Sequence, residues 1–391
     1  MSWTQKTLGE IVNLKRGFDL PSSCRVDGPY PVFSSSGQTG THSESAVKGP
    51  CVITGRYGTI GQVFYSDAAC WPLNTSLYST EFKGNDPKFV YYLLKTLPWR
   101  DYLTASAVPG INRNHVHLCP VCVPDYETQT AISGVLGSLD NKIELNTKLN
   151  GYLEEQCEAV ANHEKDFSVE LSSLCDLVKE KADYNEANFD TYVSTESLLP
   201  GKKGRQAPSS LPQTGKVTVY KAGDILVSNI RPYFKKIWYA DRTGTCSSDV
   251  LVFRAKQPEQ SGYLYSCMRS DAFFDYIMKG AKGTKMPRGD KKQMLTYKVA
   301  SNPSGATVDF IESALSQASS LSKEKHRLAA LRDVLLPKLM SGEIDVSKVD
   351  LKQLNSHLAK SLRQPGRHVS PHKNGAARTP AGRPVPLAIA S

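Results

Sequence analysis

Apolar side chains recur along residues 127–166 at alternating intervals of four and three positions. The stripe consists of Ile132, Leu136, Leu139, Ile143, Asn146, Asn150, Leu153, Cys157 and Val160, so two asparagines interrupt it. This heptad spacing keeps one face of a helix turned toward a partner helix. A buried asparagine lowers the stability of such a pair but fixes its register. We predict a long helix here, with Asn146 and Asn150 setting the register of its packing.

A second stripe of the same kind runs from about Val308 to Met340. Ala314, Leu321, Leu328 and Leu335 are spaced one heptad apart, and Ser341-Gly342 follows as a helix stop. Each stripe needs a partner, and the simplest arrangement packs the two helices against each other. The order of the chain then makes them antiparallel, with Leu321, Leu328 and Leu335 in the shared seam.

A strand-like pattern occurs once before each of these helices. The segment KGPCVITGRYGTIGQVFYSDAACWPLNTSLYSTEF begins at Lys48, and KAGDILVSNIRPYFKKIWYADRTGTCSSDVLVFRA begins at Lys221. Both contain a basic residue, a glycine, an apolar strand, a turn with an arginine, an aromatic strand and a last apolar strand. A helical segment and a loop rich in glycine, proline and basic residues follow at the same offset. This order predicts two copies of one domain.

The predicted fold class is therefore α+β. Two mixed α/β domains lie in a pseudo-two-fold arrangement, separated by two long antiparallel helices that form a coiled-coil spacer. The last segment is rich in proline, glycine and arginine and has no periodicity, so we expect it to be disordered. The predicted boundaries are 1–123 for the first domain, 124–167 for the first helix, 168–306 for the second domain, 307–342 for the second helix and 343–391 for a basic tail.

Charge is distributed unevenly over these segments and suggests a polyanionic partner. Residues 124–201 carry 11 more acidic than basic side chains, and residues 202–292 carry 11 more basic than acidic ones. The basic block is suited to a nucleic acid, and the acidic block to protein contacts away from it. Nine cysteines at irregular spacing, with no secretory signal and no long apolar run, lead us to expect a cytoplasmic protein without membrane contact.

Motifs for catalysis are missing from the sequence. It contains no phosphate-binding loop of the G-x-x-x-x-G-K-[ST] type and no strand–GxGxxG–helix fingerprint. Cys119 and Cys122, preceded by His115 and His117, form one pair without a second pair, and their alternation is more typical of a strand. We therefore predict no catalytic residue, no metal ligand and no cofactor bound by this chain.

Polar loops supply the candidate DNA contacts. Arginine and lysine can bind guanine edges, asparagine and glutamine can bind adenine edges, and hydroxyl groups and lysine can bind phosphates. Arg56 and Arg231 occupy nearly the same place in the two copies and are the leading candidates. Tyr57 and Tyr233 are equally well explained as packing residues. The full set is Ser35, Ser36, Gln38, Thr39, Arg56, Tyr57, Thr59, Asn74, Thr75, Asn112, Arg113, Asn114, Asn229, Arg231, Tyr233, Lys235, Lys236, Ser247, Ser248, Lys282, Lys285 and Arg288.

Several longer phrases resemble one family. GPYPVFSSSGQTGTH, GRYGTIGQVFY, WPLNTSLYS and SAVPGINRN look like phrases of a target recognition domain. PDYETQTAISGVLGSLDNKIELNTKLNGYLEEQ looks like a central conserved helix, and LRDVLLPKLMSGEID like a distal conserved region. Together they make residues 1–346 similar to the specificity (S) subunit of type I restriction–modification enzymes. The second domain matches more loosely, and the tail is not covered.

This resemblance implies a DNA reader that is not itself an enzyme. Each target recognition domain would bind one half of a bipartite, asymmetric site on double-stranded DNA, and the helices would set the gap. The implied partners are methyltransferase (M) subunits, numbering two, and restriction (R) subunits, which would use S-adenosylmethionine, ATP and Mg. Three alternatives remain open: a modification-only complex, a coiled-coil adaptor that never binds DNA, and an enzyme in its own right.

Overall fold

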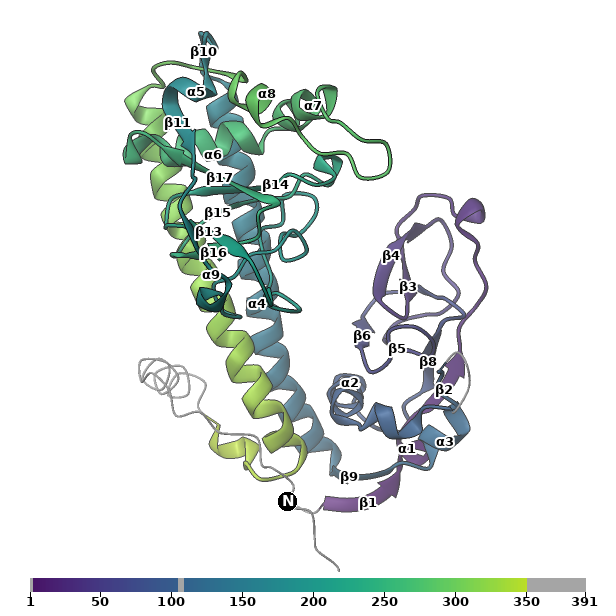
Figure 1. The fold of residues 1–391 in the computed structure, drawn as a ribbon. Coiled ribbons are helices and arrows are strands. Elements are labelled where there is room, and N and C mark those ends of the chain that lie inside the picture. Colours follow the sequence, from purple (N-terminus) through teal and green to yellow (C-terminus); the bar gives the residue numbers. More distant parts are fainter. Residues whose placement is uncertain (1–2, 105–108, 350–391) are drawn as a thin grey trace, which may run out of the picture.

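The computed structural model describes residues 3–104 and 109–349. Two domains are attached to an antiparallel pair of long helices, α4 (Tyr126–Asn162) and α9 (Gly305–Met340). Figure 1 shows the first domain beside the end of the pair where α4 begins, and the second domain beside the end where α9 begins. The predicted α+β architecture with a helical spacer is confirmed.

The first domain is built on a four-stranded sheet in the order β2-β8-β5-β6, with a smaller sheet in the order β4-β3-β7. Its elements are β1 (Trp3–Thr7), α1 (Leu8–Ile11), β2 (Asn13–Arg16), β3 (Tyr30–Ser34), β4 (Gly37–His42), β5 (Cys51–Gly55), β6 (Val63–Ser66), β7 (Trp71–Pro72), β8 (Ser76–Glu81), α2 (Pro87–Thr96), α3 (Arg113–His117) and β9 (Pro120–Pro124). β1 pairs antiparallel with β9, which leads directly into α4. The strand predicted around Cys119 and Cys122 is therefore present as β9.

The second domain is built on a sheet in the order β11-β17-β14-β15, with a smaller sheet in the order β12-β13-β16. Its elements are β10 (Val169–Glu170), α5 (Leu171–Leu174), β11 (Cys175–Leu177), β12 (Lys181–Asp183), β13 (Lys216–Tyr220), β14 (Ile225–Ser228), β15 (Ile237–Tyr239), β16 (Gly244–Cys246), β17 (Val250–Ala255), α6 (Ser261–Arg269), α7 (Asp271–Lys279), α8 (Lys291–Leu295) and β18 (Lys298–Val299).

The internal repeat predicted from the sequence is visible in the larger sheets. β5, β6 and β8 take the same places in the first domain as β14, β15 and β17 take in the second. The smaller sheets differ, because β3 pairs parallel with β7 whereas β13 pairs antiparallel with β16. The two copies thus share a framework and differ around its edge.

The helix pair follows the predicted seam. Every member of the α4 stripe is buried or half-buried, and so are Leu321, Leu328 and Leu335 of α9. The Nδ2 of Asn146 donates to Glu324 at 2.8 Å, and the Nδ2 of Asn150 donates to Ser322 at 3.1 Å. The later residue of α4, Asn150, thus pairs with the earlier residue of α9, Ser322. This reversed order confirms the antiparallel arrangement. The two asparagines form a polar layer in the middle of the spacer.

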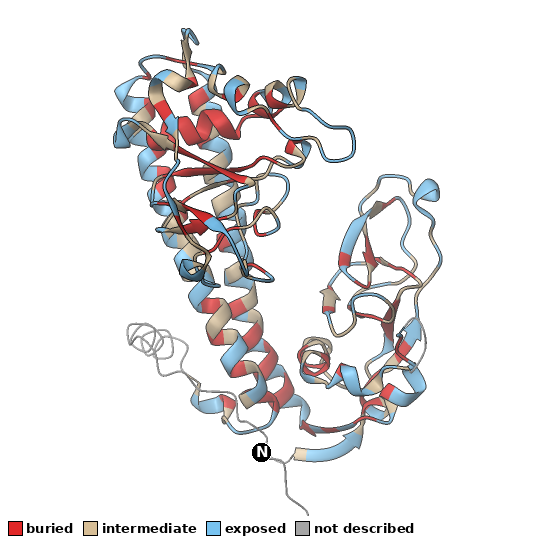
Figure 2. Ribbon diagram, in the orientation of Figure 1, coloured by how far each residue is buried: buried red, intermediate tan, exposed pale blue. Residues whose placement is uncertain are grey.

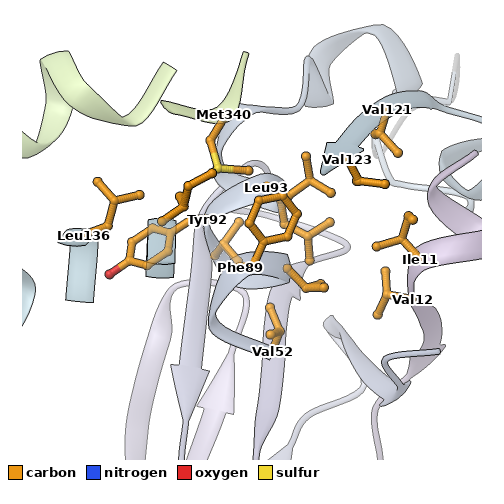
Figure 3. Close-up of a cluster of buried hydrophobic side chains, with 14 of the residues drawn as sticks. Ile11, Val12, Val52, Phe89, Tyr92, Leu93, Val121, Val123, Leu136 and Met340 are labelled. Atoms are coloured by element: carbon orange, nitrogen blue, oxygen red, sulfur yellow. The ribbon is translucent and has the colours of Figure 1, made fainter. Parts of the chain in front are cut away.

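Each end of the helix pair belongs to the core of the adjacent domain. Leu136 of α4 and Met340 of α9 share one apolar cluster with Phe89 and Leu93 of α2 (Figure 3). At the other end, Cys157 and Ile311 join the core of the second domain. Figure 2 shows buried residues continuing from the inner faces of the helices into both domains. Shared cores make each domain and its end of the spacer one packed unit.

The chain after α9 differs from the predicted tail at residues 343–349. Val346 begins a 3₁₀ turn, is buried, and packs into the cluster formed by the first domain and the helix ends. The prediction that residues 343–349 are disordered is therefore wrong. The segment is short and mostly polar, and a single buried valine in it gives no periodic signal. The remainder of the predicted tail, 350–391, lies outside the described residues. Within residues 3–104 and 109–349, no helix combines the length and apolarity that crossing a bilayer would require.

Candidate nucleic-acid interface

A basic cleft of about 780 Å³ opens in the first domain. The end of β2, the turn after β5 and the segment before α3 line it, and they contribute Lys15, Arg16, Arg56 and Arg113. Asp19 is the one acidic residue among the described residues of its lining, and it lies 3.7 Å from Arg16. The cleft thus brings together cations from three separate segments, and Lys15, Arg56 and Arg113 have no ion-pair partner among the described residues, which favours a polyanion.

Arg56 is held in the lining of this cleft by its neighbours. The backbone N–H groups of Arg56 and Tyr57 both donate to the carbonyl of Thr75, at 2.9 and 3.1 Å. The guanidinium carbon of Arg56 lies 4.5 Å from the centre of the Tyr57 ring. Tyr57 packs on Gly110 so closely that a Cβ there would lie 2.2 Å from the ring. Tyr57 therefore supports Arg56, which agrees with the packing role considered for it.

Asn112, Arg113 and Asn114 also line the cleft. Asn112 caps α3, and its side-chain oxygen accepts from the N–H of Asn114 at 3.0 Å. The structure therefore places the last two of these residues in the first turn of a short helix and not in a loop. All three side chains remain exposed. The backbone N–H of Ile111 donates to the carbonyl of Arg56, which fastens the segment before α3 to the turn after β5.

The segment 33–42 was predicted as a loop and forms the hairpin of β3 and β4 instead. Glycines and hydroxyl residues concealed its strand pairing, which is irregular between Pro31 and Phe33. Gln38 and Thr39 consequently lie on a strand, with exposed side chains, and Ser36 is exposed in the turn. Ser35 is buried, so its hydroxyl offers little surface for a contact.

The remaining candidates of the first domain differ in whether their side chains are free to contact DNA. Thr59 is exposed in the turn after β5. The Asn74 side chain is already hydrogen-bonded to Asp19, and Thr75 is half-buried below Arg56. A contact from Asn74 would therefore have to replace an internal hydrogen bond.

In the second domain, hydrogen bonds gather the predicted residues along one edge. The N–H of Asn229 donates to the carbonyl of Asp249 at 2.8 Å, and the N–H of Arg231 donates to that of Pro287 at 2.8 Å. The Arg288 guanidinium lies 3.2 Å from the Asp249 carboxylate. Three segments far apart in the sequence therefore meet at one place. They carry Asn229, Arg231, Ser247, Ser248, Lys282, Lys285 and Arg288.

The turn at this edge is conformationally unusual. Arg231 and Lys235 have φ values of 50° and 51°, in the left-handed region that non-glycine residues rarely adopt. Each costs about 1–3 kcal/mol, so surrounding contacts must hold the turn in place. Tyr233 is exposed between them, and its ring centre lies 4.6 Å from that of Phe234. Asn229 itself is buried.

Lys235 and Lys236 already have internal partners. The Nζ of Lys235 lies 3.0 Å from Asp271, and the Nζ of Lys236 donates to the carbonyl of Thr195 at 2.6 Å. Hydrogen bonds from Lys202 and Lys235 lower the pKa of the Asp271 carboxyl, and burial lowers the pKa of the Lys236 ammonium. These two lysines stabilise the turn, whereas Lys285 has no carboxylate within ion-pair distance among the described residues.

Lys15, Arg16, Met286 and Phe234 were not among the sequence candidates. Lys15 and Arg16 end a strand before Gly17, and their place beside Arg56 depends on the pairing of β2 with β8. The basic pair itself was a usable signal. Met286 and Phe234 are apolar and exposed, and an exposed apolar residue cannot be recognised from sequence alone.

His117, two residues before Cys119, has a structural role. The Nε2 of His117 accepts from the N–H of Leu14 at 3.1 Å, and burial lowers the pKa of this imidazole. Cys119 is buried and Cys122 is exposed on β9. In the described part of the chain, no group of three or more histidine, cysteine, aspartate or glutamate residues is arranged to hold a metal ion.

Comparison with known proteins gives a consistent family relationship. Residues 1–155 match the family described as "Type I restriction modification DNA specificity domain". The chain is 21% identical over 404 residues to the type I restriction enzyme EcoDI specificity subunit of Escherichia coli, covering 88% of this chain and 89% of that protein. It is 23% identical over 142 residues to the EcoprrI specificity subunit of the same organism, covering 35% of each.

The fold has a counterpart among solved structures. The S subunit of a type I restriction–modification system from M. genitalium superposes with a TM-score of 0.53 at 16% identity. The superposition covers 86% of this chain and 96% of that one. At this identity the likeness shows a common fold, which extends over both domains and the helix pair.

Proposed function

We propose that this chain, a member of the specificity-subunit family of type I restriction–modification systems, recognises a bipartite and asymmetric DNA sequence. A specificity subunit does not itself catalyse a reaction. Each domain would contact one half of the site. The helix pair would hold the two halves at a defined separation, and partner subunits would carry out the chemistry.

One observation carries this proposal: two domains with the same sheet order present different polar surfaces at opposite ends of a packed helix pair. α4 has 37 residues and is therefore about 55 Å long at ~1.5 Å per residue. Successive turns of a duplex are ~34 Å apart. Two domains attached near opposite ends of a helix pair of this length can contact sequences one to two turns apart, and their different side chains make the two half-sites different.

The outer face of α4 supports the proposed methyltransferase partners. Leu145, Leu149 and Tyr152 are exposed and spaced so that they share one face of the helix. They lie in the middle of the spacer, where neither domain's core reaches them. Contiguous exposed apolar residues on a helix are typical of a protein–protein contact. We infer that methyltransferase subunits bind here, within the acidic segment 124–201.

The cofactors of the assembly belong to those partners in this proposal. Methyltransferase subunits would bind S-adenosylmethionine, and restriction subunits would use ATP and Mg. This chain contributes DNA recognition and the relative placement of the subunits, in a complex that methylates adenine and cleaves DNA.

Selection from random duplexes tests the proposal directly. The chain would be purified together with its methyltransferase subunit, and bound DNA would be sequenced. We expect two short, dissimilar motifs separated by a gap of constant length. Enrichment of one contiguous motif, or of none, would contradict the proposal.

The role of the spacer can be tested separately. Insertion of one heptad into both helices, between residues 142 and 149 of α4 and at the facing turns of α9, preserves the seam. We expect the gap to lengthen while both half-sites keep their sequences. A gap of unchanged length would show that the helix pair does not set it.

A further inference from the structure

The segment between α7 and α8 forms a projecting hairpin. Figure 1 shows it as a long loop that extends from the second domain. Its neck is closed by two reciprocal backbone hydrogen bonds of 2.9 Å between Lys282 and Arg288. Gly283 adopts a φ of 96°, which a side chain would strain, and this allows the chain to reverse within the tip.

The hairpin is fastened to the edge that carries the other candidate contacts. Ile230 forms a β-bridge with Arg288, and the N–H of Gly289 donates to the carbonyl of Asn229 at 3.2 Å. Arg231 is bonded to Pro287 as described above. The tip therefore stands at a fixed place beside Arg231 and is not a free loop.

Met286 lies at this tip with 49% of its surface exposed. Tyr233 and Phe234, in the adjoining turn, are 47% and 39% exposed. Lys282, Lys285 and Arg288 surround Met286 along the hairpin. A large apolar side chain held in water loses the free energy that burial would provide, and exposed apolar groups ringed by polar ones mark contact sites.

The positive charges around the tip determine which partner fits. Lys282 lies 3.4 Å from Asp290 and Arg288 lies 3.2 Å from Asp249, so each of these cations has an acidic partner within the domain. Lys285, next to Met286, has no acidic partner among the described residues. An apolar tip flanked by cations matches a duplex, whose phosphates lie on both sides of a groove and whose stacked bases are apolar.

We propose that this hairpin enters a groove of the bound duplex and that the Met286 side chain inserts between two base pairs of the half-site next to the second domain. Insertion of an apolar side chain partly unstacks a base step and bends the DNA. Lys285, which has no acidic partner among the described residues, contacts a phosphate beside the unstacked step. The second domain therefore recognises deformability of its half-site in addition to base edges. This inference rests on the proposed function.

The test uses the full chain with its methyltransferase subunit and the DNA obtained by selection. 2-Aminopurine would be placed in turn at each position of the half-site assigned to the second domain, because its fluorescence rises when stacking is lost. We expect one step to brighten on binding. Met286→Ala should abolish the increase and weaken binding about tenfold, while Met286→Leu should retain both.

Two matched variants separate insertion from other effects. Lys285→Ala should weaken binding and reduce the slope of log K against log salt by about one, yet leave the fluorescence increase intact at saturation. Val334→Ala removes a comparably exposed apolar side chain on α9 and should change neither quantity. Thermal unfolding of each variant would establish that all are folded.

The outcomes distinguish this inference from the proposed function. If a bipartite site is selected but no position brightens, or if Met286→Ala binds and brightens like the parent chain, insertion is refuted while DNA recognition stands. If Met286→Leu behaves like Met286→Ala, an apolar wedge is refuted as well. If no bipartite site is selected at all, the proposed function itself fails.

Discussion

The two domains meet the helix pair through different chemistry at equivalent places. In the first domain, the Tyr92 hydroxyl of α2 donates to Asp140 at 2.7 Å, and Arg332 of α9 donates to the same carboxylate at 2.8 Å. In the second domain, Arg269 of α6 donates to Glu158 at 2.7 Å and lies 3.5 Å from Glu154. Each junction has a tyrosine donor, since the Tyr265 hydroxyl of α6 donates to Glu154 at 3.1 Å. The cation of the first junction comes from α9, whereas the cation of the second is a buried arginine of the domain itself.

The candidate DNA-contacting surfaces of the two domains differ as well. The first domain has a concave cleft in which only Arg16 has an acidic partner among the described residues. The second has an edge on which Arg288, Lys282 and Lys235 each lie beside a carboxylate. A common sheet therefore supports two surfaces with different electrostatics, because the residues that differ lie at strand ends, in turns and in short helices around it. Five substitutions test this contrast.

The largest effect is expected from Arg269→Ala. Its guanidinium is almost fully buried, and its removal leaves Glu154 without its cation and Glu158 with Lys202 alone. Breaking such a pair from one side costs about 3–5 kcal/mol. Chemical denaturation should show this loss, and hydrogen exchange should locate it in the second domain. Arg288→Ala, which breaks an exposed pair, serves as the control and should cost less than about 1 kcal/mol.

Arg56→Ala and Arg231→Ala should produce the next largest effects, on binding. If each arginine contacts a base, its loss should cost about 1–3 kcal/mol and relax the preference at one half-site only. Selection with each variant would show which half-site changes. Equal weakening on all sequences, with a shallower salt dependence, would instead assign that arginine to a phosphate.

Tyr92→Phe should have a smaller effect on stability. It removes one hydrogen bond of the first junction, but Asp140 keeps its bond to Arg332, so the expected loss is about 0.5–1.5 kcal/mol. Thermal unfolding would measure it. A loss as large as that of Arg269→Ala would show that the two junctions are energetically equivalent despite their chemistry.

The smallest effect on stability is expected from Asp249→Asn. The exposed ion pair with Arg288 contributes less than about 1 kcal/mol. Without the carboxylate, Arg288 is free for a phosphate, and the slope of log K against log salt should steepen by about 0.9. An unchanged slope would mean that Arg288 does not face DNA, and the contrast between paired and unpaired cations would lose its functional meaning.

Features with a sequence period were predicted well. The seam on α4 and the heptad of Leu321, Leu328 and Leu335 repeat over many turns, so individual exceptions did not hide them. The repeat between Lys48 and Lys221 located equivalent strands for the same reason. The burial of Ser35 and the ordered segment after α9 were harder to predict from the sequence. A serine in a glycine-rich turn is expected to be exposed. Val346 is one apolar residue in a polar segment, so no repeating pattern marks it as buried.

The sequence by itself determined the two-domain plan, the antiparallel spacer and the polar layer at Asn146 and Asn150. These features follow from spacings along the chain. The regular repeat of a helix or strand places residues at those spacings on the same face of the element. Only the tertiary structure decided which cations remain unpaired, that Lys15 and Arg16 share a cleft with Arg56, and that Met286 stands exposed on a closed hairpin. Those properties depend on contacts between residues far apart in the chain, and strand pairing and turn geometry bring them together.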